Sequence, residues 1–157
     1  MEKIAVIGGG AAGMMASIFA ARRGMEVHVY EKNEKTGKKL YITGKGRCNL
    51  TNACDMEELL ESVKSNKKFL YSAFYGFTNQ DVYDFFEAEG LKLKVERGNR
   101  VFPESDRAAD IIDALFHALR RSRVRVIQDR ARHVLVEDGA VCGVAIMPGV
   151  YISQDAL

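Results

Sequence analysis

The sequence predicts an α/β fold built on parallel strands, and three observations support that prediction. An apolar run at residues 4–7 is followed at once by a glycine cluster and by a helix-prone stretch that ends near Arg23. A second apolar run follows at residues 27–30, and a third, at residues 124–127, follows a later helix-prone stretch. Strands that are joined through a helix pair in parallel, so we expect these three runs to form one sheet.

The glycine cluster has the spacing of a phosphate-binding turn, with glycines at positions 8, 10 and 13. Gly8 allows the tight turn out of the strand, Gly10 lets the backbone approach a pyrophosphate, and Gly13 lets the helix pack against the strands. The spacing by itself is common, but in this chain the flanking strand, helix and acid are all present. We therefore predict a nucleotide site. The alternative is a βαβ unit in which the glycines serve packing alone.

The start of the predicted helix and the end of the second strand complete the predicted nucleotide site. Ala11 and Ala12 begin the helix, whose unpaired N–H groups and partial positive charge would face the phosphates. Glu31 ends the second strand, with seventeen residues between it and Gly13, and it can accept hydrogen bonds from ribose hydroxyls. Its charge would repel the 2′-phosphate of NADP, although Lys32 is its neighbour. The alternative for Glu31 is a solvated acid at a strand end.

The segment between the second and third parallel strands reads as a loop followed by helices and a hairpin. Residues 32–54 form a long loop rich in Lys, Gly, Asn and Thr, and long loops inside compact domains tend to be functional. Helical spacing of apolar residues, a capping box that begins at Thr78, and a stretch of alternating residues define the elements after it. We expect helices over 55–76 and 78–89, and a hairpin of strands 91–95 and 100–102.

The last third of the chain returns to the sheet. Ser105 or Asp106 is expected to cap a helix that runs to about Arg121 with one apolar stripe. The third parallel strand follows it. A hairpin comes next, because an Asp-Gly pair separates two runs of alternating apolar residues. Its strands are expected at 132–137 and 141–147, with the turn at Asp138-Gly139.

The loop at residues 37–52 is the second candidate site. Gly44 permits a close backbone approach or a positive φ. Lys39 and Arg47 would supply positive charge to a diphosphate, and Arg47 can donate two parallel hydrogen bonds to an oxyanion or a flavin carbonyl. Cys48 and Asn49 follow directly, and the Asn49 amide offers both a donor and an acceptor. For a single lysine, a solvated basic loop is the better interpretation, but the cluster as a whole favours a bound ligand.

Composition excludes several classes of protein. A chain of 157 residues corresponds to about one domain, and 47% hydrophobic with 28% charged residues is typical of a soluble globular protein. The net charge of +2 indicates no acidic partner. The three cysteines form no C-x-x-C pair, so we predict neither a disulfide framework nor a zinc site, and we expect a reducing cytoplasm. No apolar run approaches the ~18 residues of a membrane span, so we expect no membrane association.

An arginine-rich run at residues 120–125 raises the alternative of nucleic-acid binding. The run ends a predicted helix, where positive charge complements the helix dipole. It lacks the aromatic or glycine interleaving of a nucleic-acid surface. We therefore expect no nucleic-acid partner, and a nucleic-acid-binding protein is the distant alternative. A steep salt dependence of binding would support that alternative.

Several strings of the sequence are similar to one flavoprotein family. They are residues 6–14, residues 31–33, the string Thr-Gly-Lys-Gly-Arg-Cys-Asn-Leu-Thr-Asn at 43–52, and residues 100–103. The first string is shared by many FAD enzymes, whereas the third is far more particular. On these strings the chain resembles the start of the BaiN-like and aminoacetone-oxidase-like FAD-dependent oxidoreductases. The resemblance covers essentially all 157 residues.

This resemblance implies which parts of the chain would hold FAD. The glycine turn would bind the pyrophosphate and Glu31 the adenosine ribose, and the loop at 44–52 would run near the flavin. A backbone segment around Ala131 and Arg132 would meet the adenine. NAD(P)H is a candidate electron donor. No catalytic residue can be named, because in such enzymes the cofactor performs the redox step.

These observations lead to one fold and two main functions. We expect a partial Rossmann-type FAD-binding fold over residues 1–157, with three parallel strands, a helical insertion at about 55–105 and a C-terminal β-hairpin. The first function is an FAD-dependent oxidoreductase, or the N-terminal part of one, acting on an unknown small molecule. The alternative is a non-catalytic dinucleotide-binding remnant or regulatory module.

The resembled family differs from this chain in length. Its members continue into a strand with a second glycine-rich FAD contact and then into a substrate domain. Residues 150–157 read as the approach to that strand, so we expect a truncated product or one piece of a split protein. An unfinished sheet edge would then favour association. Whether the chain is itself an enzyme is left open.

Overall fold

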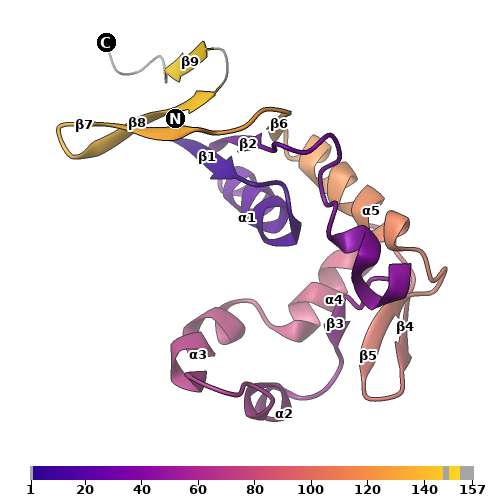
Figure 1. The fold of residues 1–157 in the computed structure, drawn as a ribbon. Helices are drawn as coiled ribbons and strands as arrows, with labels where there is room; N and C mark the ends of the chain where they lie inside the picture. The colour runs from indigo at the N-terminus through magenta and orange to yellow at the C-terminus, as the bar shows by residue number, and fades with distance from the viewer. Residues whose placement is uncertain (1, 147–148, 153–157) are drawn as a thin grey trace. The chain divides into compact units, whose positions relative to one another are not determined.

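The computed structural model describes residues 2–146 and 149–152, and the chain divides into two compact units (Figure 1). The first unit comprises residues 1–39 and 115–157. The second unit comprises residues 40–114. The boundary falls within the helix α5 (Ala108–Arg121).

A three-stranded parallel sheet forms the centre of the first unit, as the sequence predicts. Its strands are β1 (Lys3–Ile7), β2 (Glu26–Tyr30) and β6 (Arg125–Ile127), in the order β1-β2-β6. The register pairs Ile7 with Tyr30 and Tyr30 with Ile127. The carboxyl ends of the three strands therefore lie together, and both the glycine turn and Glu31 follow from this edge.

The helix α1 (Ala11–Arg22) joins β1 to β2 and packs through small and apolar side chains. Met14 and Ile18 on the helix and Val29 on β2 are fully buried. Arg23 caps the helix, and Gly24 then turns the chain with a φ of +87°, a conformation that costs glycine little. The βαβ unit is thus the one that the apolar runs and the glycines predict.

The predicted C-terminal hairpin is confirmed in the first unit. It consists of β7 (His133–Glu137) and β8 (Ala140–Ile146). Asp138 and Gly139 have φ values of +49° and +78°, and positive values at both positions are what a two-residue hairpin turn needs. β9 (Gly149–Ile152) adds an antiparallel strand to β8. Residue 147, which ends the second predicted hairpin strand, lies outside the described residues. So do residues 153–157 of the stretch 150–157, which is predicted to approach a further strand.

The second unit holds a small antiparallel sheet with the order β3-β5-β4. The predicted hairpin is confirmed as β4 (Leu93–Glu96) and β5 (Arg100–Pro103). The expectation of a structureless loop at 32–54 is wrong in part, because this stretch contains a 3₁₀ segment, Leu40–Gly46, and the strand β3 (Thr51–Asn52). The short strand exists because β5 offers it a partner, which local sequence alone does not reveal.

Of the two predictions made for the helices of the second unit, one is wrong and one is confirmed. The single helix expected at 55–76 is wrong: α2 (Met56–Glu61) and α3 (Lys67–Gly76) are separated by a break at Asn66, whose φ is +54°. Asparagine tolerates this left-handed conformation better than most residues. The capping box of α4 (Asn79–Ala88) is confirmed, because Thr78 Oγ1 accepts from the Asp81 N–H at 3.0 Å and Asp81 Oδ2 accepts from the Thr78 N–H at 2.7 Å.

The apolar stripe that the sequence predicts on α5 is buried. Ile111, Ile112, Leu115 and Leu119 are each at most 1% exposed. The helix begins at Ala108 and the residue before it is Arg107, so the expected N-cap at Ser105 or Asp106 is wrong. No helix among the described residues is both long and apolar enough to cross a bilayer.

Candidate dinucleotide site

The glycine turn leaves β1 and opens toward solvent. The Gly8 N–H donates to the Tyr30 carbonyl at 2.8 Å, and its φ of +102° is one that side chains rarely adopt. Gly10 is the N-cap of α1 and has ordinary extended backbone, and a Cβ added there would meet nothing within 4 Å. No side chain caps this helix, and Ala11 and Ala12 are exposed. The first N–H groups of α1 therefore face an open space of the kind that binds a phosphate.

Gly13 has the packing role that the sequence predicts. A Cβ at this position would lie 2.0 Å from the Gly8 carbonyl oxygen, so the first turn of α1 lies directly against the glycine turn. Ser17, one turn later, is fully buried, and its hydroxyl donates to the Gly13 carbonyl at 2.7 Å. The third glycine is therefore required by the fold, whereas the space beside Gly10 is free for a ligand.

Gly9 has a structural role that sequence reasoning does not assign. Its N–H donates to Glu31 Oε2 at 2.8 Å, and its carbonyl accepts from the Gly37 N–H at 2.8 Å. A Cβ on Gly9 would lie 2.5 Å from Cγ2 of the buried Thr36. The segment after β2 thus folds back over the glycine turn. The only sequence signal for this contact is that Gly8, Gly9 and Gly10 follow one another, because the spacing of the phosphate turn does not need a glycine at position 9.

Glu31 is buried, with 6% of its surface exposed, and its carboxylate is held by protein donors. Oε2 accepts from Gly9, and Oε1 accepts from the backbone N–H and the side-chain amide of Asn33 at 2.8 and 2.6 Å. Burial acts to raise the pKa of Glu31, but the hydrogen bonds from Asn33 and Gly9 and the charge of Lys32 leave that pKa below its ordinary value. Glu31 is therefore fixed in position and ionised at neutral pH.

We expect Glu31→Gln to destabilise the first unit by about 1–3 kcal/mol at pH 7, because a neutral amide offers one acceptor where the carboxylate offers two. In the natural chain the folded-state pKa lies below the unfolded one, so the carboxylate's contribution is full above the unfolded value and is lost as pH falls through the folded value. Urea unfolding at pH 7 and at steps between pH 5 and 3 measures both effects. Equal stability of the two proteins at pH 7 would contradict this role.

Ala131 and Arg132 lie in the first unit between β6 and β7. The Arg132 N–H donates to the Ala145 carbonyl at 2.8 Å, which ties this segment to the hairpin. The Arg132 side chain is exposed. Lys32 and Lys39 are also exposed residues of the first unit.

The glycine-rich loop of the second unit is built from left-handed turns. Gly44, Lys45, Gly46 and Cys48 all have positive φ, between +55° and +85°. A Cβ on Gly44 would lie 2.8 Å from the Asn49 nitrogen, so this glycine is needed for the loop to close on itself. The Asn49 amide nitrogen, in the orientation that satisfies its surroundings, donates to the Val101 and Thr51 carbonyls at 3.2 Å.

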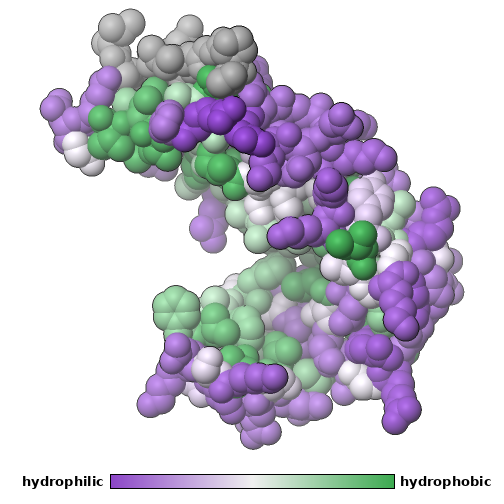
Figure 2. Space-filling view, in the orientation of Figure 1, coloured by the Kyte–Doolittle hydropathy of each residue, from purple (hydrophilic) through white to green (hydrophobic). Residues whose placement is uncertain are grey.

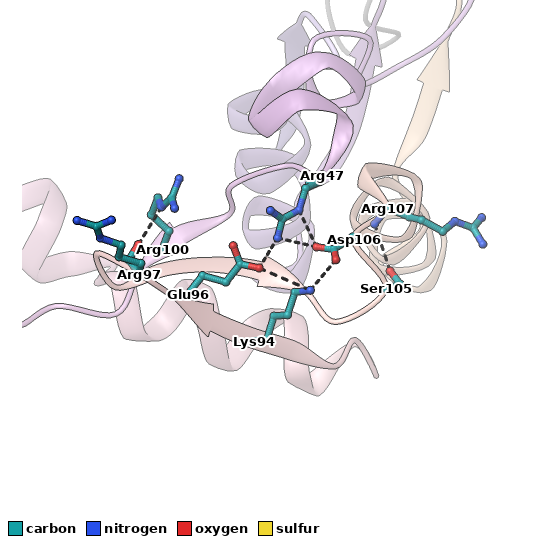
Figure 3. Close-up of polar contacts among 8 residues, drawn as sticks. All are labelled: Arg47, Lys94, Glu96, Arg97, Arg100, Ser105, Asp106 and Arg107. Carbon is teal, nitrogen blue, oxygen red and sulfur yellow. Dashed lines mark hydrogen bonds and ion pairs between the residues drawn. The ribbon is translucent and has the colours of Figure 1, made fainter.

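Arg47 is held by an ion-pair network within the second unit (Figure 3). Its Nε donates to Asp106 Oδ1 at 2.6 Å, and its Nη2 pairs with Glu96. Lys94 Nζ lies 2.6 Å from Asp106 Oδ2. The hydrogen bond from Arg47 lowers the pKa of Glu96, and those from Lys94 and then Arg47 lower the pKa of Asp106. Two cations and two carboxylates thus balance in charge.

The Arg47 guanidinium also lies 4.1 Å from the ring centroid of Phe102 on β5. These contacts fasten the glycine-rich loop to the β4–β5 hairpin, and sequence reasoning did not identify Glu96, Asp106 or Lys94 as partners of Arg47. Cys48, the next residue, is 2% exposed, and burial raises the pKa of its thiol. A protonated, enclosed thiol is typical of a structural cysteine rather than of a redox-active one.

The parallel βαβ unit, its open glycine turn and the buried acid at the end of β2 define a dinucleotide-binding Rossmann-type domain. A family model described as the HI0933-like protein Rossmann domain matches residues 2–154. The chain belongs to this family, and the resemblance seen in the sequence strings is confirmed. Within the part of the chain that the structure describes, no cluster of three or more His, Cys, Asp or Glu side chains could hold a metal ion.

Two curated relatives are similar to this chain over most of its length. The 3-dehydro-bile acid delta(4,6)-reductase of Clostridium scindens is 37% identical over 128 residues, which are 80% of this chain and 31% of that protein. The ribosomal RNA dihydrouridine synthase of Escherichia coli is 32% identical over 119 residues, which are 76% of this chain and 29% of that protein. The chain thus spans less than a third of the length of either relative.

Solved structures share the fold. The THI4 protein of Thermovibrio ammonificans has a TM-score of 0.61 at 15% identity, covering 92% of this chain and 46% of that one. The glycine oxidase of Bacillus cereus has a TM-score of 0.56 at 16% identity, covering 97% and 53%. At these identities the likeness concerns the fold alone.

Proposed function

We propose that the first unit binds the adenosine and pyrophosphate part of FAD, and that the chain is the FAD-binding part of a flavin-dependent oxidoreductase. The observation that carries the proposal is the open space at Gly10, in front of the uncapped start of α1, at the same sheet edge as the buried Glu31. Family membership supports FAD as the dinucleotide.

The residues of the first unit fit the two polar parts of this ligand. The N–H groups at the start of α1 would donate to the pyrophosphate, with the partial positive charge of the helix behind them. Oε1 of Glu31 already accepts two hydrogen bonds, but Oε2 accepts one and keeps a lone pair, so the carboxylate can accept from a ribose hydroxyl through Oε2. Gly9 and Asn33 would keep that carboxylate from rotating away. Bound FAD would supply two-electron transfer at its flavin ring.

The remaining predicted contacts stay proposals. The backbone at Ala131 and Arg132 would meet the adenine, and Lys32 and Lys39 would add positive charge. Gly44, Cys48 and Asn49, which lie in the second unit, stay predicted contacts of the flavin part of FAD. Arg47 would act through the glycine-rich loop, since its Nε and Nη2 already serve Asp106 and Glu96.

The two relatives point to a common reaction type for the longer proteins. Their names describe addition of hydrogen to a carbon–carbon double bond, in a 3-dehydro-bile acid and in a uridine of ribosomal RNA. In both substrates the double bond is conjugated with a carbonyl group, which makes its far carbon an acceptor for hydride. We propose this class of substrate for the protein to which this domain contributes, with NAD(P)H as electron donor.

An RNA substrate is the second candidate, and the relative named as a ribosomal RNA dihydrouridine synthase favours it. The absence of a nucleic-acid partner therefore stays a prediction. Titration of a uridine-containing single-stranded RNA at several salt concentrations distinguishes an RNA substrate from a small-molecule substrate. Binding with a steep salt dependence would favour RNA, and no binding at low salt would favour a small molecule.

FAD titration tests the proposed function directly. We expect added FAD to give a bound-flavin spectrum and, at about 100 times its Kd, to stabilise the chain by about 2.7 kcal/mol in a thermal melt. ADP should compete with FAD and riboflavin should not, because the first unit would contact the ADP half. A folded chain that neither FAD nor ADP stabilises would contradict the proposal.

A further inference from the structure

The hairpin strand β7 is an open sheet edge. It pairs with β8 on one side, and no strand within residues 2–146 and 149–152 pairs with its other side. Such an edge presents a row of backbone donors and acceptors, and natural edges are usually blunted by charges, proline or a bulge that twists them away. The three residues in the middle of β7, Val134, Leu135 and Val136, carry no such protection. The register with β8 shifts between Leu135 and Val136, and the extra residue at this shift is Cys142 on β8.

The apolar side chains of this hairpin are unusually exposed. Val134 and Val136 on β7 are 57% and 56% exposed, and Val141, which pairs with Val136, is 70% exposed. Figure 2 shows hydrophobic residues gathered over the hairpin, at the upper left of the view. Valines of high strand propensity along an open edge are the type of surface that pairs with another strand.

The charges of β7 select one way of pairing. His133 begins the strand and Glu137 ends it, while Arg132 lies just before the strand and Asp138 begins the turn after it. If two copies of β7 run antiparallel around Leu135, each His133 faces a Glu137 and each Val134 faces a Val136, and Arg132 and Asp138 come to the same ends of the paired strands. A parallel arrangement would place like charges side by side, which is unfavourable. β7 is therefore complementary to a second copy of itself, in charge and in apolar contact, only when the two strands run antiparallel.

We propose that two copies of this chain pair antiparallel through β7, with the twofold axis at Leu135. The interface is isologous, because the same strand contributes from both copies. It joins the sheet β7-β8-β9 of one copy to the same sheet of the other copy. It satisfies the open backbone groups of both edges and covers Val134 and Val136. This proposal does not depend on FAD binding.

Sedimentation equilibrium over a range of concentrations tests the pairing. The wild-type chain should approach twice its 17.5 kDa mass as concentration rises. Val136→Lys should weaken the dimer at least roughly tenfold, because a charged edge position next to an apolar partner disfavours strand addition. The matched control is Val95→Lys, which charges a 51% exposed valine on β4. This strand is at the edge of the sheet β3-β5-β4 in the second unit, so the variant should leave the dimer intact.

Charge exchange tests the register. His133→Glu should weaken the dimer by placing carboxylates opposite each other, and adding Glu137→His should restore it. Far-UV circular dichroism and melting with and without FAD would show that each variant is folded. A wild-type monomer at all concentrations, or a dimer that survives Val136→Lys, would overturn the proposal and leave the edge to a partner of different sequence. Failure of the double variant to restore the dimer would overturn the antiparallel register.

Discussion

Gly10→Val is expected to abolish FAD binding while the domain stays folded. The backbone at Gly10 has φ −78° and ψ −175°, which valine adopts readily, and the added Cβ meets no protein atom within 4 Å. The new side chain would instead fill the space proposed for the pyrophosphate. We expect FAD affinity to fall at least roughly 100-fold, or about 2.8 kcal/mol, in a titration followed by flavin absorbance.

Gly10→Ala is the matched control, since one methyl group intrudes less than the branched valine side chain. We expect an intermediate loss of affinity, with a melting temperature in the absence of FAD close to that of the natural chain for both variants. A folded Gly10→Val protein with unchanged FAD affinity would place the pyrophosphate elsewhere. A Gly10→Val protein that is unfolded without FAD would show that the open space at Gly10 is needed for folding.

Gly13→Ala is expected to destabilise the first unit before any ligand is added. Its Cβ would lie 2.0 Å from the Gly8 carbonyl oxygen, and that atom belongs to the backbone and has no side-chain rotamer by which to move away. The helix α1 must then shift from the turn. We expect a loss of about 3 kcal/mol or more in the free energy of unfolding, measured by urea denaturation without FAD.

Gly76→Ala provides the comparison for Gly13→Ala. Gly76 is the last residue of α3, and a Cβ there meets nothing within 4 Å. This variant should be neutral or more stable by about 0.4–1 kcal/mol, since alanine restricts the unfolded chain. If Gly13→Ala were as stable as Gly76→Ala, the close packing of α1 on the glycine turn would be refuted.

The two glycine variants separate roles that the sequence motif combines. Both positions belong to one Gly-x-Gly-x-x-Gly spacing, and the sequence correctly predicts that Gly13 serves packing. The distinction between a filled and an open space is nevertheless a property of the folded chain. Because the space at Gly10 is open and that at Gly13 is filled, we expect loss of binding at Gly10 and loss of stability at Gly13 to be measurable independently.

Local chemistry explains why so much of the fold can be predicted. The parallel strands at residues 4–7, 27–30 and 124–127 are apolar runs next to strong turn and helix signals, and the Asp138-Gly139 turn and the Thr78 capping box each depend on a few adjacent residues. Such features are encoded by short-range sterics and hydrogen bonding. Where a distant partner decides, as for β3 against β5, the prediction fails.

The sequence by itself determined the βαβ unit, the phosphate-binding spacing and the acid at the end of the second strand, because each follows from residues close together in the chain. Only the tertiary structure decided that Gly9 and Asn33 hold the Glu31 carboxylate, since β2 must first lie beside β1 for these groups to meet. It likewise decided that Arg47 is paired with Glu96 and Asp106, which are 49 and 59 residues away. A side chain's charge is written in the sequence, but its partner depends on which segments the fold brings within hydrogen-bonding distance.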